Sequence, residues 1–81
     1  MKIPRDLSSD NLIKLLNEYG YNITRQAGSH IRLTSSLKGK EHNITIPVQK
    51  SLKVGTLNNI IGDIAEYLEV EKKGLLIKLF G

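Results

Sequence analysis

Apolar residues in the first quarter of the chain recur at the spacing of an amphipathic helix. They lie three and four positions apart, at Leu12, Ile13, Leu15, Leu16 and Tyr19. Polar residues fall on the opposite face, at Asn11, Lys14, Asn17 and Glu18. Ser8 or Ser9 is the predicted N-cap, and Gly20 is expected to stop the helix.

The period then changes to two, which predicts β-strands with one apolar face. Polar and apolar residues alternate in three runs, residues 21–24, 30–34 and 43–48. Short polar connections separate the runs, so we predict an antiparallel meander of three strands. Pro47 has no amide hydrogen for a strand ladder, so the third strand is expected to be an edge strand or to end there.

Helical spacing returns after a basic loop that covers residues 49–55. The apolar positions of this second predicted helix are Leu57, Ile60, Ile61, Ile64, Ala65 and Leu68. Residues 71–80 fit a short third helix at the C-terminal end.

The predicted order is therefore α-β-β-β-α with a short helical extension, in the α+β class. Because each strand has one apolar face, both main helices must pack on that face of the sheet, and the other face stays open to water. A chain of 81 residues holds a single core, so we expect one domain over residues 1–81.

Composition narrows the chemistry available to this domain. The chain has no cysteine, which excludes disulfides, thiolate catalysis and cysteine metal sites and fits a reducing cytosol. We see no signal peptide and no apolar run long enough to span a membrane, so we expect a cytoplasmic protein without membrane contact. The sequence contains no glycine-rich phosphate loop, so we expect no nucleotide cofactor.

Positive charge is concentrated in the middle of the chain, where a polyanion such as nucleic acid would bind. The formal net charge is +4, and residues 21–55 hold six lysines and arginines against Glu41 alone. Apart from Arg32, the candidate phosphate-binding side chains lie in predicted loops or at the terminus: Lys2, Arg5, Lys38, Lys40, Lys50 and Lys53. The alternative is an ordinary solubilising surface.

Strand alternation places His30 on the open face of the predicted sheet. Ile31 and Leu33 must face the helices, so His30 and Arg32 point the other way. Gly28 and Ser29 come directly before, and we expect the glycine to allow close approach of another backbone segment. Spacing alone favours an ordinary surface histidine over a general acid or base, which is the alternative interpretation.

Two other patterns argue against competing sites. His42 lies near a turn beside Lys40 and Glu41, which favours a structural or solvated role. A metal shared with His30 would need a third ligand, so we predict no metal site. The three tyrosines occupy apolar positions, so we expect no aromatic platform for stacking single-stranded bases.

Four blocks of sequence together resemble the HicA (YcfA-like) family of toxins. They are Ile3–Ser8 with Leu15–Gly20, Arg25–Gln26 with Gly28–Leu33, Ile46–Val48, and Gly55–Leu57 with Ile60–Ile61. The resemblance runs from the N-terminus to about Ile64, and its specific part is Gly28-Ser29-His30.

This resemblance implies a fold like the double-stranded RNA-binding domain and a ribonuclease that cleaves mRNA. It also implies a HicB-like antitoxin that covers the active surface, with the functional histidine at His30 and its motif neighbours at Gly28 and Ser29. Our hypothesis is metal-independent cleavage, in which His30 takes the 2′-hydroxyl proton and Arg32 or a loop lysine stabilises the phosphorane. An inert RNA-binding module and a protein-interaction domain are the alternatives.

Overall fold

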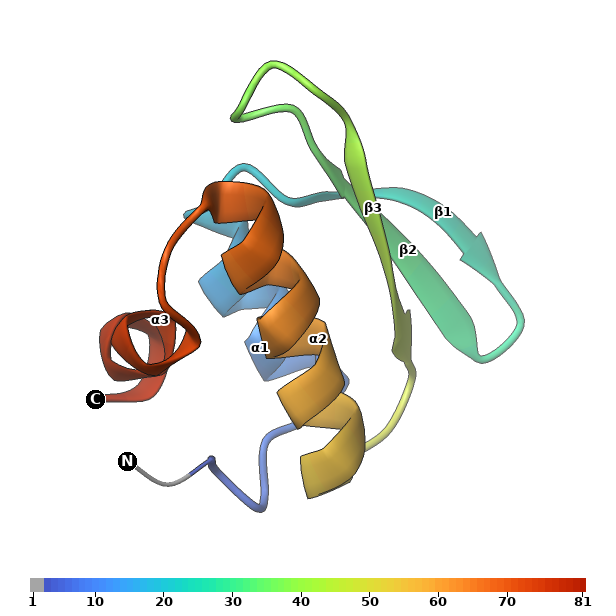
Figure 1. Cartoon of the computed structure of the whole chain (residues 1–81). Helices are drawn as coiled ribbons and strands as arrows, with labels where there is room; N and C mark the ends of the chain where they lie inside the picture. Colours follow the sequence, from blue (N-terminus) through green and yellow to red (C-terminus); the bar gives the residue numbers. More distant parts are fainter. Residues whose placement is uncertain (1–2) are drawn as a thin grey trace.

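The computed structural model describes residues 3–81, and its elements follow the order predicted from the sequence (Figure 1). Lys2 lies outside the described residues. The elements are α1 (Ser9–Asn17), β1 (Asn22–Ala27), β2 (His30–Ser35), β3 (His42–Pro47), α2 (Val54–Leu68) and α3 (Lys72–Phe80). This is the α+β arrangement of a double-stranded RNA-binding domain, extended by α3.

The first helix is capped as its sequence predicts. The Ser8 side chain accepts a hydrogen bond of 3.1 Å from the amide of Asn11, and Asp10 lies in the first turn. The helix ends at Asn17, and Gly20 adopts a φ of +81° in the turn that leads to β1. None of the helices in residues 3–81 has both the length and the apolarity of a membrane span.

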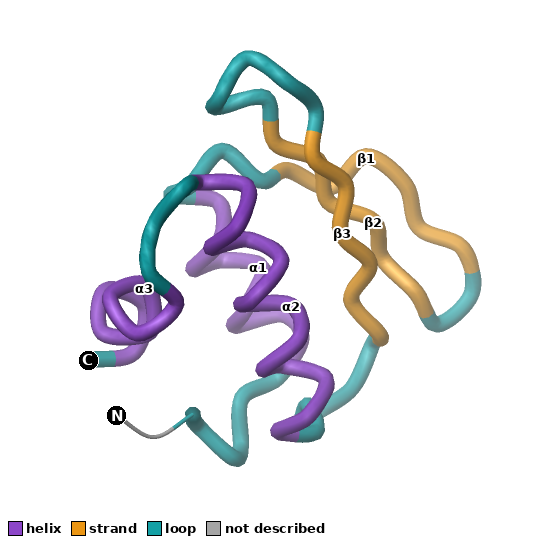
Figure 2. Tube along the Cα trace, in the orientation of Figure 1, coloured by secondary structure: helices purple, strands orange, loops and turns teal. Residues whose placement is uncertain are grey.

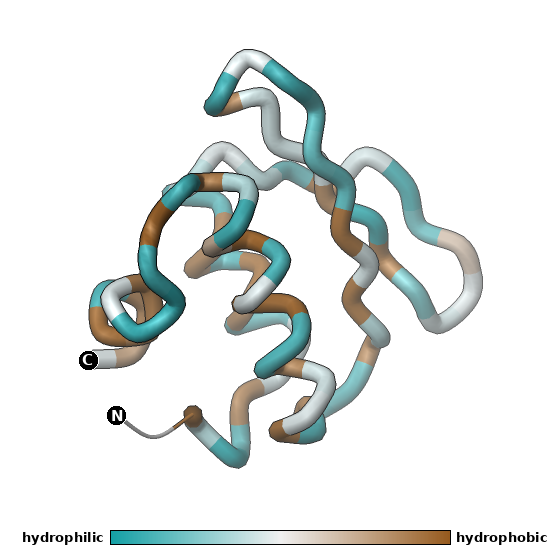
Figure 3. Tube along the Cα trace, in the orientation of Figure 1, coloured by the Kyte–Doolittle hydropathy of each residue, from teal (hydrophilic) through white to brown (hydrophobic). Residues whose placement is uncertain are grey.

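One face of the sheet carries the core, and the other carries no helix. The strands are antiparallel in the order β1-β2-β3, and α1 and α2 lie on the same side of them (Figure 2). Ile31, Leu33, Ile44 and Ile46 point toward the helices and are buried. Figure 3 shows that apolar positions recur along both the helices and the strands on either side of this interior. α3 packs on α2 through residues such as Leu75.

The alternation in residues 21–24 predicts that the helices cover Ile23 like the other apolar strand residues, and this prediction is wrong. Ile23 pairs with Leu33, yet its side chain is 53% exposed, and all six residues of β1 are exposed. β1 is an edge strand, and the β1–β2 hairpin extends away from the helices (Figure 1). The helices therefore leave this apolar side chain uncovered.

The β1–β2 connection is a two-residue turn of Gly28 and Ser29, since Ala27 pairs directly with His30. Gly28 has a φ of +59°, which suits the first central residue of a tight hairpin turn. The prediction that another backbone segment approaches Gly28 closely is wrong, because a Cβ at Gly28 would meet nothing within 4 Å. Glycine is favoured here by its backbone angle.

The loop after β3 ties the tip of the hairpin to the start of α1. The amide of Val48 donates to the carbonyl of Ser29 at 2.7 Å. One residue later, Gln49 and the buried Ser9 are joined by their backbones at 3.0 Å and by the Ser9 hydroxyl at 3.2 Å. The two-residue turn, this loop and the first turn of α1 therefore form one connected end of the molecule.

The backbone angle of Gly28 gives a stability prediction. Replacing Gly28 with alanine places an L-residue at positive φ and should lower the free energy of unfolding by about 1 kcal/mol. Gly28→Asn should be milder, because asparagine tolerates this conformation. Gly55→Ala is the matched control, since its Cβ also enters open space but its φ is not positive. Urea unfolding that shows equal losses for both alanine variants would contradict this account.

Candidate functional site

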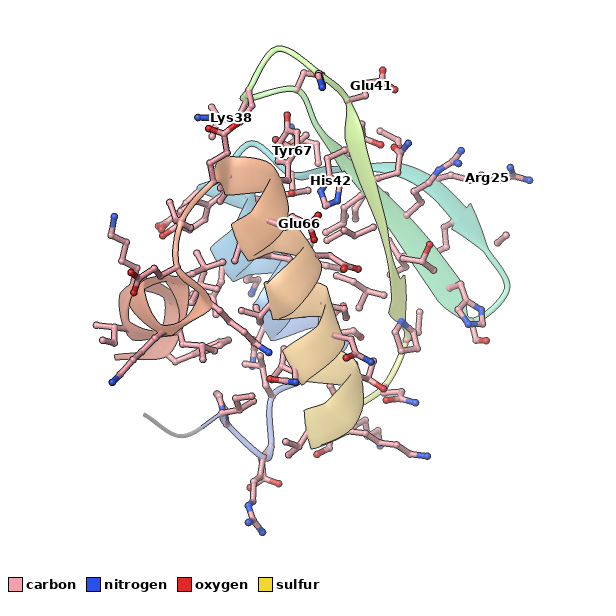
Figure 4. All side chains as sticks on the ribbon, viewed as in Figure 1. Arg25, Lys38, Glu41, His42, Glu66 and Tyr67 are labelled. Atoms are coloured by element: carbon pink, nitrogen blue, oxygen red, sulfur yellow. The ribbon has the colours of Figure 1, made fainter. Side chains whose placement is uncertain are left out.

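A β-bulge in β1 determines which side chains share the open face with His30. Ile23 pairs with Leu33, but the following pair joins Arg25 to Arg32 and leaves Thr24 without a partner of its own. Thr24 and Arg25 therefore together oppose a single residue of β2. Both side chains then lie on the open face. Figure 4 shows Arg25 reaching away from the sheet, on the side opposite α2.

Sequence reasoning missed Arg25 as a site residue. Strict alternation from Ile23 would have placed it on the helix face, where Gln26 lies in the structure. A bulge changes that parity by one residue, and the sequence of β1 contains no glycine or proline that would mark it. The available signals were the arginine itself, three residues before the exposed turn at Gly28, and its place in one of the blocks that resemble the HicA family.

Around His30 the open face forms a shallow hollow of about 170 Å³. Its lining is two arginines, one histidine and two small side chains, namely Arg25, Arg32, His30, Ala27 and Thr45. All five residues are exposed, and no carboxylate is among them. The imidazole therefore faces solvent in a positively charged, water-accessible setting.

Hydroxyl groups beside the hollow hold the bulge in place. The Thr24 hydroxyl lies 2.9 Å from that of Thr34 and 3.5 Å from the carbonyl of Arg32. Thr34 in turn donates to the side-chain oxygen of Asn43 at 2.6 Å. This polar chain crosses all three strands on the open face and fixes the backbone from which Arg25 projects.

Some of the predicted RNA-binding residues lie at the same end of the sheet as His30. Gly28 and Ser29 form the turn next to it, and Lys50 follows the loop that is bonded to that turn. The carbonyl of Arg5 accepts a 2.9 Å hydrogen bond from Ser51, which places the Arg5 backbone beside the same loop. Lys53 is the N-cap residue of α2, at the end of this loop.

Lys38 and Lys40 lie elsewhere. They follow Ser35, which is five residues from His30 along β2, or roughly 17 Å at the rise of a strand. Both lysines line a different hollow, of about 400 Å³, with His42 and three acidic residues of the α2 region. The structure therefore does not bring these two lysines to His30.

His42 has a structural role, as its position near the turn predicted. Its Nδ1 lies 2.6 Å from the Tyr21 hydroxyl, and its ring stacks on Tyr67 at 4.7 Å with an interplanar angle of 11° (Figure 4). Tyr21 is fully buried, as predicted, and Tyr67 is partly buried against the core. His42 faces the helices at the far end of the sheet, so it cannot share a proton with His30.

Burial and the neighbouring Tyr67 and Asp63 raise the pKa of Tyr21 well above its ordinary value. The phenol therefore stays protonated, and it shares the 2.6 Å hydrogen bond with Nδ1 of His42. In residues 3–81, no three histidine, cysteine or acidic side chains come close enough to hold a metal ion.

Comparison with known proteins gives one family match. Residues 9–65 match the family described as the HicA toxin of bacterial toxin-antitoxin systems. This segment runs from α1 into α2 and includes the whole sheet, with the hollow around His30. Searches of curated proteins and of solved structures gave no significant match.

The buried phenol of Tyr21 should make stability fall in alkaline solution. The unfolded chain releases this proton near the ordinary pKa of 10.0, whereas the folded protein retains it. The free energy of unfolding should therefore fall above about pH 10, by on the order of 1.4 kcal/mol per pH unit. Urea unfolding of Tyr21→Phe should lack this component of the decline, and the partly buried Tyr19→Phe should keep it. Identical pH profiles for Tyr21→Phe and the wild type would contradict the prediction.

Proposed function

Since the chain belongs to the HicA toxin family of bacterial toxin-antitoxin systems, we propose that it is an endoribonuclease that cleaves mRNA and uses His30 as its general base. The observation that carries this proposal is the hollow on the open face. It combines one solvent-facing imidazole with two arginines, and no carboxylate neutralises them there. An exposed site of this kind suits a long polymer that has no need to enter a deep pocket.

In the proposed reaction the imidazole of His30 removes the proton from a ribose 2′-hydroxyl. The 2′-oxygen attacks the adjacent phosphorus, and the bond from phosphorus to the 5′-oxygen of the next nucleotide breaks. Arg32 stabilises the charge on the phosphorane. Water protonates the leaving oxygen, because no other side chain of the hollow exchanges a proton near neutral pH. The products are a 2′,3′-cyclic phosphate and a 5′-hydroxyl.

RNA binding in this proposal uses the end of the sheet where the hollow lies. Arg32 contacts phosphate beside His30, and Gly28 and Ser29 offer backbone and hydroxyl groups at the turn. Lys50, Lys53 and Arg5 extend the basic surface along the adjoining loop, and the predicted role of Lys2 remains a proposal. Lys38 and Lys40 would reach only an RNA that extends along the length of the sheet.

The open face favours recognition by shape and phosphate. Its side chains are short and polar or positively charged, and none of the three tyrosines lies on it. Hydroxyl and amide groups such as Thr45 and Asn43 suit contacts to 2′-hydroxyls and phosphates of folded RNA. Stacking of unpaired bases would need aromatic side chains that this face lacks.

A toxin of this kind has a protein partner that restrains it. We propose a HicB-like antitoxin that covers the open face around His30. Because the hollow is shallow and exposed, a protein lying across it would exclude a polymer substrate without entering a pocket.

Removing the imidazole should abolish cleavage and leave the fold intact, because His30 is exposed. We expect His30→Ala to lose at least 100-fold in RNA cleavage rate, the usual contribution of a general base. Asn59→Ala, on the exposed side of α2, should cleave like the wild type. Wild-type products should carry a 2′,3′-cyclic phosphate, and EDTA should leave the rate unchanged.

The opposite results are equally specific. Full cleavage by His30→Ala would remove this residue from the mechanism. A 5′-phosphate product, or activity lost in EDTA, would replace the proposed chemistry with a metal-dependent reaction. Salt-dependent RNA binding without cleavage by the wild type would favour an inert RNA-binding module, which the lack of a second proton carrier also fits.

A further inference from the structure

Two arginines stand directly opposite each other next to His30, an arrangement that does not help the fold. Arg25 and Arg32 are cross-strand partners, and like charges in such pairs destabilise a sheet. The hollow that they line contains no acidic side chain to offset them. An unfavourable local arrangement of this kind is expected where a binding function requires it.

We propose that Arg25 and Arg32 together form a phosphodiester-binding site, which holds the phosphate next to the ribose on which His30 acts. The inference rests on the proposed function, because it defines how the same hollow holds its substrate. It adds Arg25 to the site and makes the arginine pair, rather than the loop lysines, the main contact of the reacting phosphate.

The shape of the hollow fits this ligand. Guanidinium groups present planar pairs of donors that match phosphate oxygens, and two of them reach the same space from adjacent strands. Ala27 is the cross-strand partner of His30, and its small side chain leaves the imidazole accessible. The volume of about 170 Å³ equals that of roughly six liquid water molecules, which accommodates a phosphate group.

The bulge is the structural device that creates the pair. Without the additional residue, Arg25 would lie on the helix face and would not pair with Arg32. The Thr24 hydroxyl, which donates to Thr34 and lies 3.5 Å from the carbonyl of Arg32, holds this irregular segment on an otherwise exposed edge strand. A segment fixed in this way holds the backbone of Arg25 in the position from which its side chain reaches the hollow.

The surroundings of the pair favour nucleic acid over a protein carboxylate as its ligand. The large exposed apolar residues are Ile23, Leu37, Val48, Val54, Val70 and Ile77. Ile23 and Val48 line a groove with α1 on the helix face, and the others lie in loops or helices. None of these apolar residues lines the hollow, so the surroundings of the arginine pair have the polar, positive character of a nucleic-acid interface.

The test measures binding separately from cleavage. The probe is a 2′-O-methyl RNA 12-mer, which has no free 2′-hydroxyl and cannot be cleaved by the proposed reaction. The double variant R25Q/R32Q is compared with K38Q/K40Q. Each variant removes two positive charges from a chain of net charge +4, but the two lysines lie at the far end of the sheet. Circular dichroism and urea unfolding confirm that both variants are folded.

We expect R25Q/R32Q to bind the probe at least tenfold more weakly than K38Q/K40Q, as the loss of a charged hydrogen-bonded contact predicts. Its plot of log affinity against log salt should also be shallower by about one unit. Ala27→Leu keeps every charge but fills the hollow, and it should weaken binding as well. Asn59→Ala, on the exposed side of α2, should bind the probe like the wild type.

Equal affinities of the two double variants would overturn the inference, and wild-type cleavage of ordinary RNA would then leave the proposed function standing. Conversely, wild-type protein that binds through the arginine pair but does not cleave would refute the nuclease and retain the phosphate site. Unchanged RNA affinity combined with lost affinity for the antitoxin would assign the pair to a protein carboxylate, which also overturns the inference.

Discussion

The pairing register of β2 places His30 and Arg32 on the open face of the sheet. Ile31 and Leu33 are buried against the helices, so the neighbouring His30 and Arg32 must face the other way. A slip of one residue would bury His30 and Arg32 and expose both apolar side chains. Full burial of such side chains stabilises the fold by roughly 1.5–3 kcal/mol each, which is enough to exclude the slipped register. Packing of the core on the opposite face of β2 thus keeps His30 on the open face.

Backbone hydrogen bonds extend this constraint from the strand to the loops around the hollow. The two-residue turn fixes the start of β2, and the bond from Val48 to Ser29 fixes the end of β3 beside it. The links between Ser9 and Gln49 then join this end of the sheet to α1. The basic loop follows directly, so its position depends on the same few bonds.

Much of the fold followed from residue spacing, because helices and a one-sided sheet impose distinct periods. The same spacing predicted the open face for His30, although the Gly28–His30 motif alone could not define the rest of the site. Arg25 was missed because a bulge changes parity without a local sequence marker. Ile23 was misplaced because its exposure depends on how far the helices reach across β1. By contrast, a meander places its successive loops at opposite ends of the sheet, so the separation of Lys40 from Lys50 could have been derived.

The two histidines lie on opposite faces of the sheet, and the alternation of strand residues therefore gives them different surroundings. His42 faces the helices, where a buried phenol and a stacked tyrosine ring occupy it. His30 faces water, where its nitrogens are free for a ligand. An open site has one proton carrier and little shelter from water, which limits the rate that it can reach. In the proposed function, this openness lets RNA reach the site and lets the antitoxin block it by lying across one face. Under that proposal, coverage of the open face is enough to restrain the toxin, so the chemistry does not need a deep pocket.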